Sequence, residues 1–219
     1  MAKNLIPSAL LQRCSAIATS TWSDALDQLG IAGVIQGLVL QSGSGRVAGS
    51  AVTVRETTGP LHENSRESFN VGAFIDVLGE GNILVIDMGG AMISSFGGLA
   101  SQAARKQGAT GVVINGGCRD VADIRASGLW VRSRHITPVS GKGRVQVDGV
   151  NVPITVCGVP VNPGDYIIGD ETGLVCVGAD ELQEALTTAE GLREQDERFS
   201  DALRDGHSFG STAARLKHL

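Results

Sequence analysis

Hydrophobic side chains recur at helical spacing at the two ends of the chain and gather in short runs between them. Apolar residues at three- and four-residue intervals over residues 8–18 predict a first helix. A second helix is expected over residues 22–29, with hydroxyl side chains at 19–21 as caps and Gly30 as its stop. The chain is therefore expected to begin with a helical segment.

The centre of the chain mixes strands with helices. The strongest apolar run, Asn82–Met88, is typical of a buried strand. The elements expected here are the strands 46–55, 82–88 and 111–115 and the helices 69–78 and 99–107. Residues 57–65 are expected to form a polar loop, and Gly89-Gly90 and Gly97-Gly98 to bracket another. This order is typical of an α/β fold.

The last third of the chain is expected to be rich in strands and to end in a helix. Asp148-Gly149 lies between alternating residues, a pattern typical of a two-residue hairpin. A final helix is expected to start with Asp180 as N-cap and Gln183 as capping-box partner, and to end near Leu203. Short strands are expected at 154–157, 165–168 and 174–177. Because no repeat or linker occurs, we expect a single domain over 1–219, with its core at about 17–178 and the C-terminal helix at about 180–204.

Composition and charge narrow the class of protein. Of the 219 residues, 42% are hydrophobic and 4% aromatic, so the core is expected to be aliphatic. The net charge is −5 and no dense basic cluster occurs, which disfavours binding to nucleic acid. Four cysteines without a Cys-x-x-Cys pair, and no signal peptide, predict a cytoplasmic protein with reduced thiols. No apolar run approaches the roughly 18 residues of a membrane helix, so no membrane partner is expected.

The stretch Gly116–Asp120 is the strongest candidate for chemistry. After the predicted strand 111–115, a turn at the two glycines is expected to present Arg119 and Asp120 at the carboxyl end of a strand, where α/β sheets bind ligands. Arginine can hold a carboxylate, and aspartate can bind a hard divalent cation, so the pair suggests a site for a metal-chelated oxo-acid. The structural alternative is that Asp120 caps the next helix and Asp123 complements its dipole.

Two further segments could contribute to a site. The glycine-rich loop that ends at Gly97-Gly98 could present free N–H groups to an anion, or could simply connect a strand to a helix. The acidic pair Asp170-Glu171 could contribute across a subunit boundary, but a plain turn is the favoured interpretation because Asp and Gly are ordinary turn residues.

Other common catalytic arrangements are not expected. The four histidines, His62, His135, His207 and His218, lie far apart and match no zinc-binding spacing. No Gly-x-Ser-x-Gly motif occurs, and Cys118 has no evident histidine partner. Cys118 is expected to pack beside the turn rather than act as a nucleophile.

Several segments also occur together, in the same order, in one known family. They are Thr21–Leu26, Ile83–Asp87, Gly111–Asp120, Thr137-Pro138 and Pro163–Asp165. On these residues the chain, over about 17–205, resembles the family that joins class II 4-hydroxy-4-methyl-2-oxoglutarate aldolases to the regulator of ribonuclease activity A (RraA-like proteins). The resemblance implies an α/β domain of the swivelling β/β/α type with helical N- and C-terminal segments. It also implies assembly as a homotrimer or as a hexamer made of two trimers.

The resemblance also implies roles for the candidate residues. Asp120 would hold a divalent metal, Mg²⁺ or Mn²⁺, and Arg119 would contact the pyruvyl group as the catalytic residue. The substrate carboxylate would be held by the backbone around Gly97, Gly98, Leu99 and Ala100. The implied activity is cleavage of 4-hydroxy-2-oxo diacids to pyruvate and a second oxo-acid, decarboxylation of oxaloacetate, or both. The implied alternative is a non-catalytic, protein-binding regulator.

One position departs from the aldolase pattern. The aldolases of this family carry an acidic residue separated from the arginine by twenty residues, and in this sequence that position is Gly98. Aldol cleavage needs a base for the 4-hydroxyl proton and decarboxylation does not, so decarboxylation is expected to survive the departure better. The candidate replacements are Asp87, Glu63, Glu67, or Glu171 from a neighbouring subunit.

Overall fold

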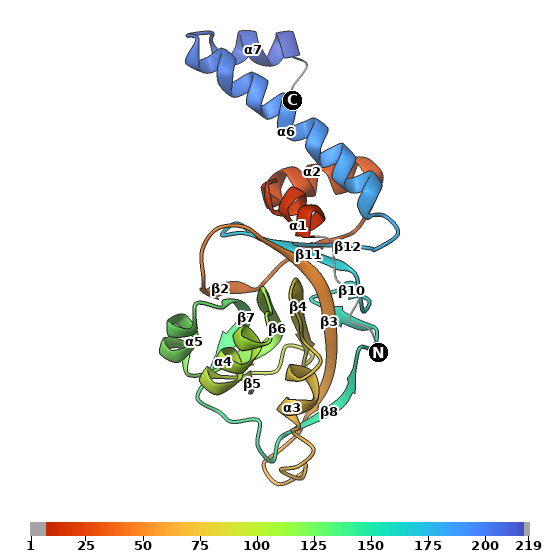
Figure 1. Ribbon diagram of the computed structural model, residues 1–219, viewed down its shortest axis with the longest axis vertical. Helices are drawn as coiled ribbons and strands as arrows, with labels where there is room; N and C mark the ends of the chain where they lie inside the picture. Colours follow the sequence, from red (N-terminus) through yellow and green to blue (C-terminus); the bar gives the residue numbers. More distant parts are fainter. Residues whose placement is uncertain (1–7, 217–219) are drawn as a thin grey trace.

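The computed structural model describes residues 8–216, which form a curled mixed sheet with helices packed around it (Figure 1). The ten-stranded sheet has the order β1-β12-β11-β3-β4-β6-β7-β2, with β8 also paired to β3 and β5 to β6; β9 and β10 form a separate hairpin. The strands are β1 (Val34–Ile35), β2 (Val39–Ser42), β3 (Val47–Thr58), β4 (Asn82–Asp87), β5 (Ser94–Phe96), β6 (Gly111–Cys118), β7 (Trp130–Ile136), β8 (Val145–Val150), β9 (Ile154–Val156), β10 (Val159–Val161), β11 (Tyr166–Gly169) and β12 (Leu174–Val177). The helices are α1 (Ser8–Ser15), α2 (Thr19–Leu29), α3 (Val71–Ile75), α4 (Gly98–Lys106), α5 (Val121–Ser127), α6 (Leu182–Arg204) and α7 (Phe209–Leu216).

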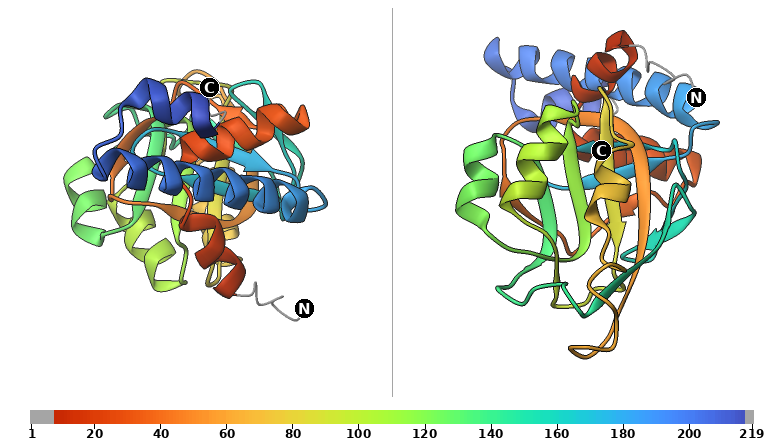
Figure 2. Two further views of the ribbon diagram at one scale, coloured as in Figure 1. Left: turned by 90° about the horizontal axis from the view of Figure 1, so that it is seen from above. Right: turned by 60° about the horizontal axis from the view of Figure 1, so that its bottom comes forward.

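The parallel strands β3, β4, β6 and β7 form the centre of the sheet and are covered on both faces. Successive side chains of a strand point to opposite faces. Along β4, Leu84 and Ile86 therefore join a core cluster with α3, α4 and α5, whereas Ile83 and Val85 join a second cluster with the β9–β10 hairpin. Figure 2 shows the three helices together on one side of the sheet. Burial on both faces explains why the interior of β4, from Ile83 to Ile86, is wholly apolar.

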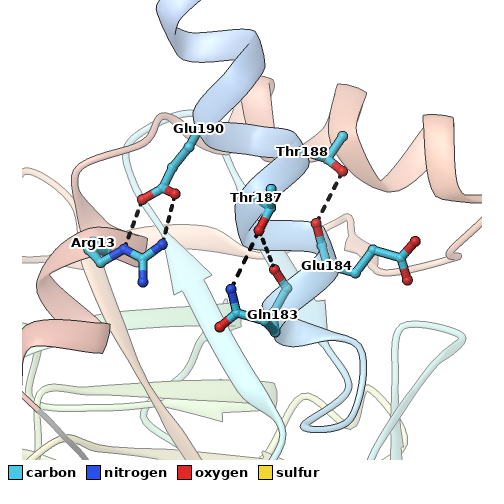
Figure 3. Close-up of polar contacts among 6 residues, drawn as sticks. All are labelled: Arg13, Gln183, Glu184, Thr187, Thr188 and Glu190. Carbon is cyan, nitrogen blue, oxygen red and sulfur yellow. Dashed lines mark hydrogen bonds and ion pairs between the residues drawn. The ribbon is translucent and has the colours of Figure 1, made fainter.

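The terminal helices form a third cluster against the outer strands β11 and β12. Arg13 of α1 donates two hydrogen bonds of 2.9 and 2.8 Å to the Glu190 carboxylate of α6, which ties the two ends of the chain together (Figure 3). The second half of α6 extends beyond the sheet (Figure 1). There it packs against α7 through Phe199 and Phe209, whose ring centroids are 5.0 Å apart.

The predicted α/β class and the helical ends are confirmed. Gly30 ends α2 in a left-handed conformation with φ of 69°, as predicted. The expected hydroxyl caps at 19–21 are wrong, because α2 begins at Thr19 after Ala18 as N-cap. Thr19 instead donates its backbone N–H and its hydroxyl to the Asp170 carboxylate.

The predicted turn at the two glycines before Arg119 is wrong, because β6 continues through both of them to Cys118. A Cβ atom on Gly116 would lie 2.4 Å from Met88 Sδ, and one on Gly117 would lie 2.6 Å from the Ile93 carbonyl oxygen. Glycine is therefore needed here for close packing against the strand and not for a turn.

The predicted hairpin at Asp148-Gly149 is also wrong. β8 runs through these residues and pairs antiparallel with β3, with Gly149 opposite Arg55 and a register shift between Arg55 and Glu56. The chain turns later, at Asn151, which has a φ of 54°. The extra residue is thus absorbed by a bulge in the ladder.

The capping box predicted for the final helix is wrong, although the helix itself is present and ends at Arg204. α6 begins after Glu181, whose side chain makes no capping hydrogen bond. The preceding loop is fixed by Asp165 instead, since its carboxylate accepts a hydrogen bond of 3.3 Å from Ala179 N.

Elements with weak hydrophobic periodicity are absent from the sequence-based prediction or differ from it. The strands β1, β2, β5, β7 and β10 were not expected, and α3 covers only Val71–Ile75 of the predicted 69–78. Asn70 caps α3 by accepting a hydrogen bond from Ala73 N, and a turn held by Asn82 follows the helix. Short strands with polar residues carry too little periodicity to be identified from sequence.

Candidate functional site

The residues singled out from the sequence meet at the carboxyl end of β6. A cavity of about 240 Å³ opens there, between the start of α4, β5 and the loops that precede α3 and β8. Its lining residues are Phe69, Val71, Ser94, Ser95, Phe96, Gly97, Gly98, Leu99, Ala100, Arg119, Asp120, Ser140 and Lys142. The structure thus brings Arg119, Asp120 and the glycine segment of α4 together on one cavity.

The Asp120 carboxylate is directed toward α4 and not toward the helix that follows it. Asp120 has a left-handed backbone with φ of 53°, which aspartate tolerates better than most residues. It occupies the N-cap position of α5, but its side chain caps no N–H of that helix. Its Oδ2 atom accepts a hydrogen bond of 3.3 Å from Gly98 N and lies 3.4 Å from Arg119 Nε.

The two glycines at the start of α4 leave no space for a side chain. A Cβ atom on Gly97 would lie 2.8 Å from Asp120 Oδ2, and one on Gly98 would lie 2.6 Å from Asp123 Cβ. The acidic residue expected at position 98 in an aldolase could not be accommodated beside Asp123. In this chain the carboxylate of Asp123 itself lies next to Gly98, with its Oδ2 atom 3.0 Å from the point that a Cβ atom on Gly98 would occupy.

The cavity presents positive charge and free backbone N–H groups. The first-turn amides of α4, which include Leu99 and Ala100, have no acceptor within the helix, and the helix dipole adds partial positive charge at this end. Arg119 and Lys142 both line the same cavity. The arrangement favours an anion with one or two carboxylates.

Lys142 was missed by the sequence analysis because it lies in a loop without periodicity. The loop is brought to the cavity by a bridge between Ser94 and Ser140 and by a hydrogen bond of 2.9 Å from Ser94 N to the Val139 carbonyl oxygen. No local signal in the sequence indicates this long-range pairing.

Glu56 was missed as well. It lies on β3 and is only 4% exposed. Burial raises its pKa to about 8; the nearby Ser95 hydroxyl lowers it, and Asp148 raises it. The available signal was an acidic residue in phase with the buried Val52 and Val54 of the same strand, since alternate residues share a face.

The four acidic residues considered as replacements for the missing base do not line this cavity. Asp87 accepts a hydrogen bond of 2.8 Å from Asn115 Nδ2 and lines a separate hollow. Glu63 and Glu67 are exposed in the loop before α3. Glu171 accepts a hydrogen bond from Gly45 N near the turn between β11 and β12.

Asp170 is held by hydrogen bonds of the fold. Its carboxylate accepts bonds of 2.9 and 2.6 Å from Thr19 N and Oγ1, and further bonds from Thr172 N and Gly173 N. Burial raises the pKa of Asp170, but these hydrogen bonds outweigh burial and lower it. The geometry fits the turn interpretation of this segment.

The histidines do not gather at the cavity. His62 is exposed with φ of 74°, His135 Nε2 lies 3.1 Å from the Gly90 carbonyl oxygen, and His207 is exposed. His218 lies outside the described residues. Between residues 8 and 216 there is no group of three or more His, Cys, Asp or Glu side chains placed to hold a metal by themselves.

The cysteines are free thiols. Cys118 is buried in the core as the last residue of β6, and the turn beside which it was expected to pack is absent. Its Sγ atom lies 3.4 Å from Ser133 Oγ, and burial raises the pKa of the thiol. A raised pKa leaves little reactive thiolate. In the part of the chain that the structure covers, no helix combines the length and the apolar composition needed to cross a membrane.

Comparisons with known proteins find one matching family and several relatives. The family model described as RraA-like, Aldolase/RraA, matches residues 19–176. Protein DlpA of Legionella pneumophila is 31% identical over 212 residues, which are 94% of this chain but 34% of DlpA, so the chain spans about a third of that relative. A Deinococcus radiodurans protein named "Putative 4-hydroxy-4-methyl-2-oxoglutarate aldolase" is 32% identical over 165 residues, 75% of this chain and 96% of its own length. The crystal structure of an uncharacterized protein from Pseudomonas syringae pv. tomato matches with a TM-score of 0.83 at 27% identity, covering 96% of this chain and 99% of that one.

Proposed function

Because the chain belongs to the Aldolase/RraA (RraA-like) family, we propose that it is a divalent-metal-dependent carbon–carbon lyase that acts on a pyruvyl-containing 2-oxo acid and releases pyruvate. The reaction is retro-aldol cleavage of a substrate of the 4-hydroxy-4-methyl-2-oxoglutarate type, decarboxylation of oxaloacetate, or both. The observation that carries the proposal is the convergence of Arg119, Asp120 and the first turn of α4 on one cavity.

Arg119 is the proposed catalytic residue of this reaction. When the carbon–carbon bond breaks, negative charge moves to the ketone oxygen, and a fixed cation beside that oxygen stabilises the resulting enolate. The backbone of the α4 segment is proposed to hold the substrate carboxylate, because its amides lack intrahelical acceptors. The residues of that segment are Gly97, Gly98, Leu99 and Ala100.

Asp120 is the proposed ligand of the metal, Mg²⁺ or Mn²⁺. Its side chain is 42% exposed and can therefore accept a metal ion from solvent. Mg²⁺ usually takes one or two protein carboxylates and keeps several waters, so a single exposed aspartate fits such an ion. When bound, the ion supplies Lewis-acid polarisation of the ketone.

Asp123 is proposed to supply the carboxylate that the aldolase pattern places at position 98. It is exposed and lies against Gly98, which lines the cavity. Neither Asp123 nor the four candidates considered from the sequence line the cavity themselves. Retro-aldol cleavage depends on such a base and decarboxylation does not. We therefore expect oxaloacetate decarboxylation to be the more robust of the two activities.

A homotrimer or hexamer is part of the same proposal, as is a cytoplasmic location. Large apolar side chains stand exposed: Leu99 at the cavity is 84% exposed, Met92 before β5 63% and Ile136 at the end of β7 56%. A second copy of the chain would remove these side chains from water. The same exposed side chains would suit the alternative function, a non-catalytic protein-binding regulator.

Pyruvate release with Mg²⁺, from oxaloacetate and from 4-hydroxy-4-methyl-2-oxoglutarate in parallel, tests the proposal. Asp120→Asn is the informative variant, because asparagine also tolerates the left-handed backbone and removes only the charge. Asp205→Asn, at the end of α6, is the matched control. A reaction without enzyme corrects for decarboxylation by the free metal.

The outcomes separate the candidate functions. Release that is lost in Asp120→Asn and kept in Asp205→Asn supports the lyase. Release from oxaloacetate alone supports the decarboxylase and removes the proposed role of Asp123. No release from either substrate contradicts the lyase and favours the protein-binding regulator.

A further inference from the structure

A second acidic group, Glu56 on β3, lies next to Ser95 of the cavity wall. Glu56 shares the face of β3 with Val52 and Val54, which belong to the apolar cluster under α3, α4 and α5. Within residues 8–216 neither carboxylate oxygen of Glu56 has a hydrogen-bond partner, and the Ser95 hydroxyl also lacks one. Two unpaired polar groups therefore lie together inside an otherwise apolar layer.

Ser95 connects this pair to the cavity. It is the middle residue of β5, is 3% exposed and forms part of the cavity wall together with Arg119 and Asp120. Its hydroxyl is near enough to Glu56 to lower the pKa of that carboxyl, which burial raises to about 8. At neutral pH Glu56 is therefore mostly protonated and can donate a proton.

Packing alone gives no reason for a glutamate at this position. A leucine or methionine would continue the row of Val52 and Val54, and an unpaired buried carboxyl destabilises the fold. A buried polar group that destabilises the fold beside a cavity suggests that the group takes part in binding or catalysis in that cavity.

We propose that Glu56, acting through the Ser95 hydroxyl, is the internal proton donor to the carbanion that forms when a carbon–carbon bond of the oxo-acid breaks. This inference rests on the proposed lyase function. Glu56 is a positioning residue in this scheme, because Ser95 and not Glu56 meets the substrate.

The Ser95 hydroxyl and the Glu56 carboxyl together pass one proton to the enolate. A C–H bond forms at the methylene carbon of the pyruvate enolate as the Ser95 O–H bond breaks. Ser95 regains a proton from the Glu56 carboxyl, so the enolate becomes pyruvate and Glu56 becomes a carboxylate. Water returns the proton to Glu56 after pyruvate leaves. In decarboxylation this supplies the one proton that the reaction consumes.

Exchange of the pyruvate methyl hydrogens in D₂O tests the proposal, because it is the same proton transfer run in reverse. The full-length protein with Mg²⁺ is followed by proton NMR as wild type, Glu56→Gln, Ser95→Ala, Ser95→Thr and Glu184→Gln. Glu184 is exposed on α6 (Figure 3) and does not line the cavity, so it provides the matched control.

We expect Glu56→Gln and Ser95→Ala to slow exchange by about 100-fold or more, the usual contribution of a positioned acid or base. The pyruvate concentration at half-maximal rate should stay unchanged, since neither group binds the carboxylate. Ser95→Thr, which keeps the hydroxyl, should restore most of the exchange, and Glu184→Gln should match wild type. A role in packing alone would not produce rescue by threonine.

The results of the exchange assay distinguish failure of the proton-donor inference from failure of the lyase proposal. Exchange by wild type that is undiminished in Glu56→Gln overturns the proton-donor inference and leaves the lyase intact. Exchange that is equal in Ser95→Ala and Ser95→Thr overturns it as well, and this pair decides the matter if Glu56→Gln does not fold. Absence of exchange in wild type, together with absence of pyruvate release, is a failure of the lyase proposal itself.

Discussion

Replacement of Glu56 by glutamine should stabilise the protein at neutral pH and leave its stability in acid unchanged. Burial raises the pKa of Glu56 from 4.5 to about 8, so the folded protein keeps a proton that the unfolded chain gives up above pH 4.5. Between these two pKa values, each rise of one pH unit lowers the free energy of unfolding of the wild type by about 1.4 kcal/mol. Over the whole interval the loss is roughly 5 kcal/mol. Glutamine has no proton to lose and avoids this cost.

Urea unfolding at several values between about pH 4 and pH 9 measures the effect. The free energy of unfolding of Glu56→Gln minus that of wild type should be near zero at the acid end. It should grow through the interval and level off above the folded pKa of about 8. The same difference for Glu184→Gln, an exposed residue on α6, should stay near zero throughout. A constant difference across the range for Glu56→Gln would refute the argument that a buried, protonated carboxyl sets this dependence.

The remaining predictions concern packing and a surface ion pair. Gly98→Ala places a Cβ atom 2.6 Å from Asp123 Cβ and should lower stability by about 1–3 kcal/mol, with partial recovery in the double variant with Asp123→Gly, as measured by thermal unfolding. Gly117→Ala meets a backbone oxygen at 2.6 Å and should cost at least as much, with no side-chain truncation able to restore stability. Arg13→Ala should cost less than about 1 kcal/mol, because the Arg13 side chain is 47% exposed; a double-mutant cycle with Glu190→Ala measures the coupling.

Of the central strands, β4 was the most predictable, because burial on both faces leaves a clear trace in the sequence. The run Asn82–Met88 predicts it almost to the residue, since its four inner residues are all buried and apolar. Glycine was harder to interpret, because it permits both a turn and a close approach. At Gly116 and Gly117 the close approach of neighbouring chain segments is the reason for glycine. That contact depends on the tertiary fold and is not visible in the local sequence.

The residues of the candidate site were likewise predictable only where a local sequence motif marks them. Arg119 and Asp120 were identified because adjacent residues at a strand end form a recognisable motif. Lys142 and Ser95 come to the cavity from other parts of the chain, through pairings that no local pattern encodes. Glu56 could have been noticed as a charge on the apolar face of its strand, but its relation to Ser95 appears only when β3 and β5 are in place.

Main chain forms part of the cavity wall, because a Cβ atom on Gly97 or Gly98 would lie only 2.8 or 2.6 Å from the side chain of a facing aspartate. A side chain can be introduced there only together with a change in that aspartate, so a single substitution should not remodel this part of the wall. Other parts of the wall consist of ordinary side chains, Phe69 and Val71 before and within α3 and Lys142 in the loop before β8. Under the proposed lyase function, differences in oxo-acid preference should therefore gather on those residues, and laboratory evolution of a new preference should begin with them.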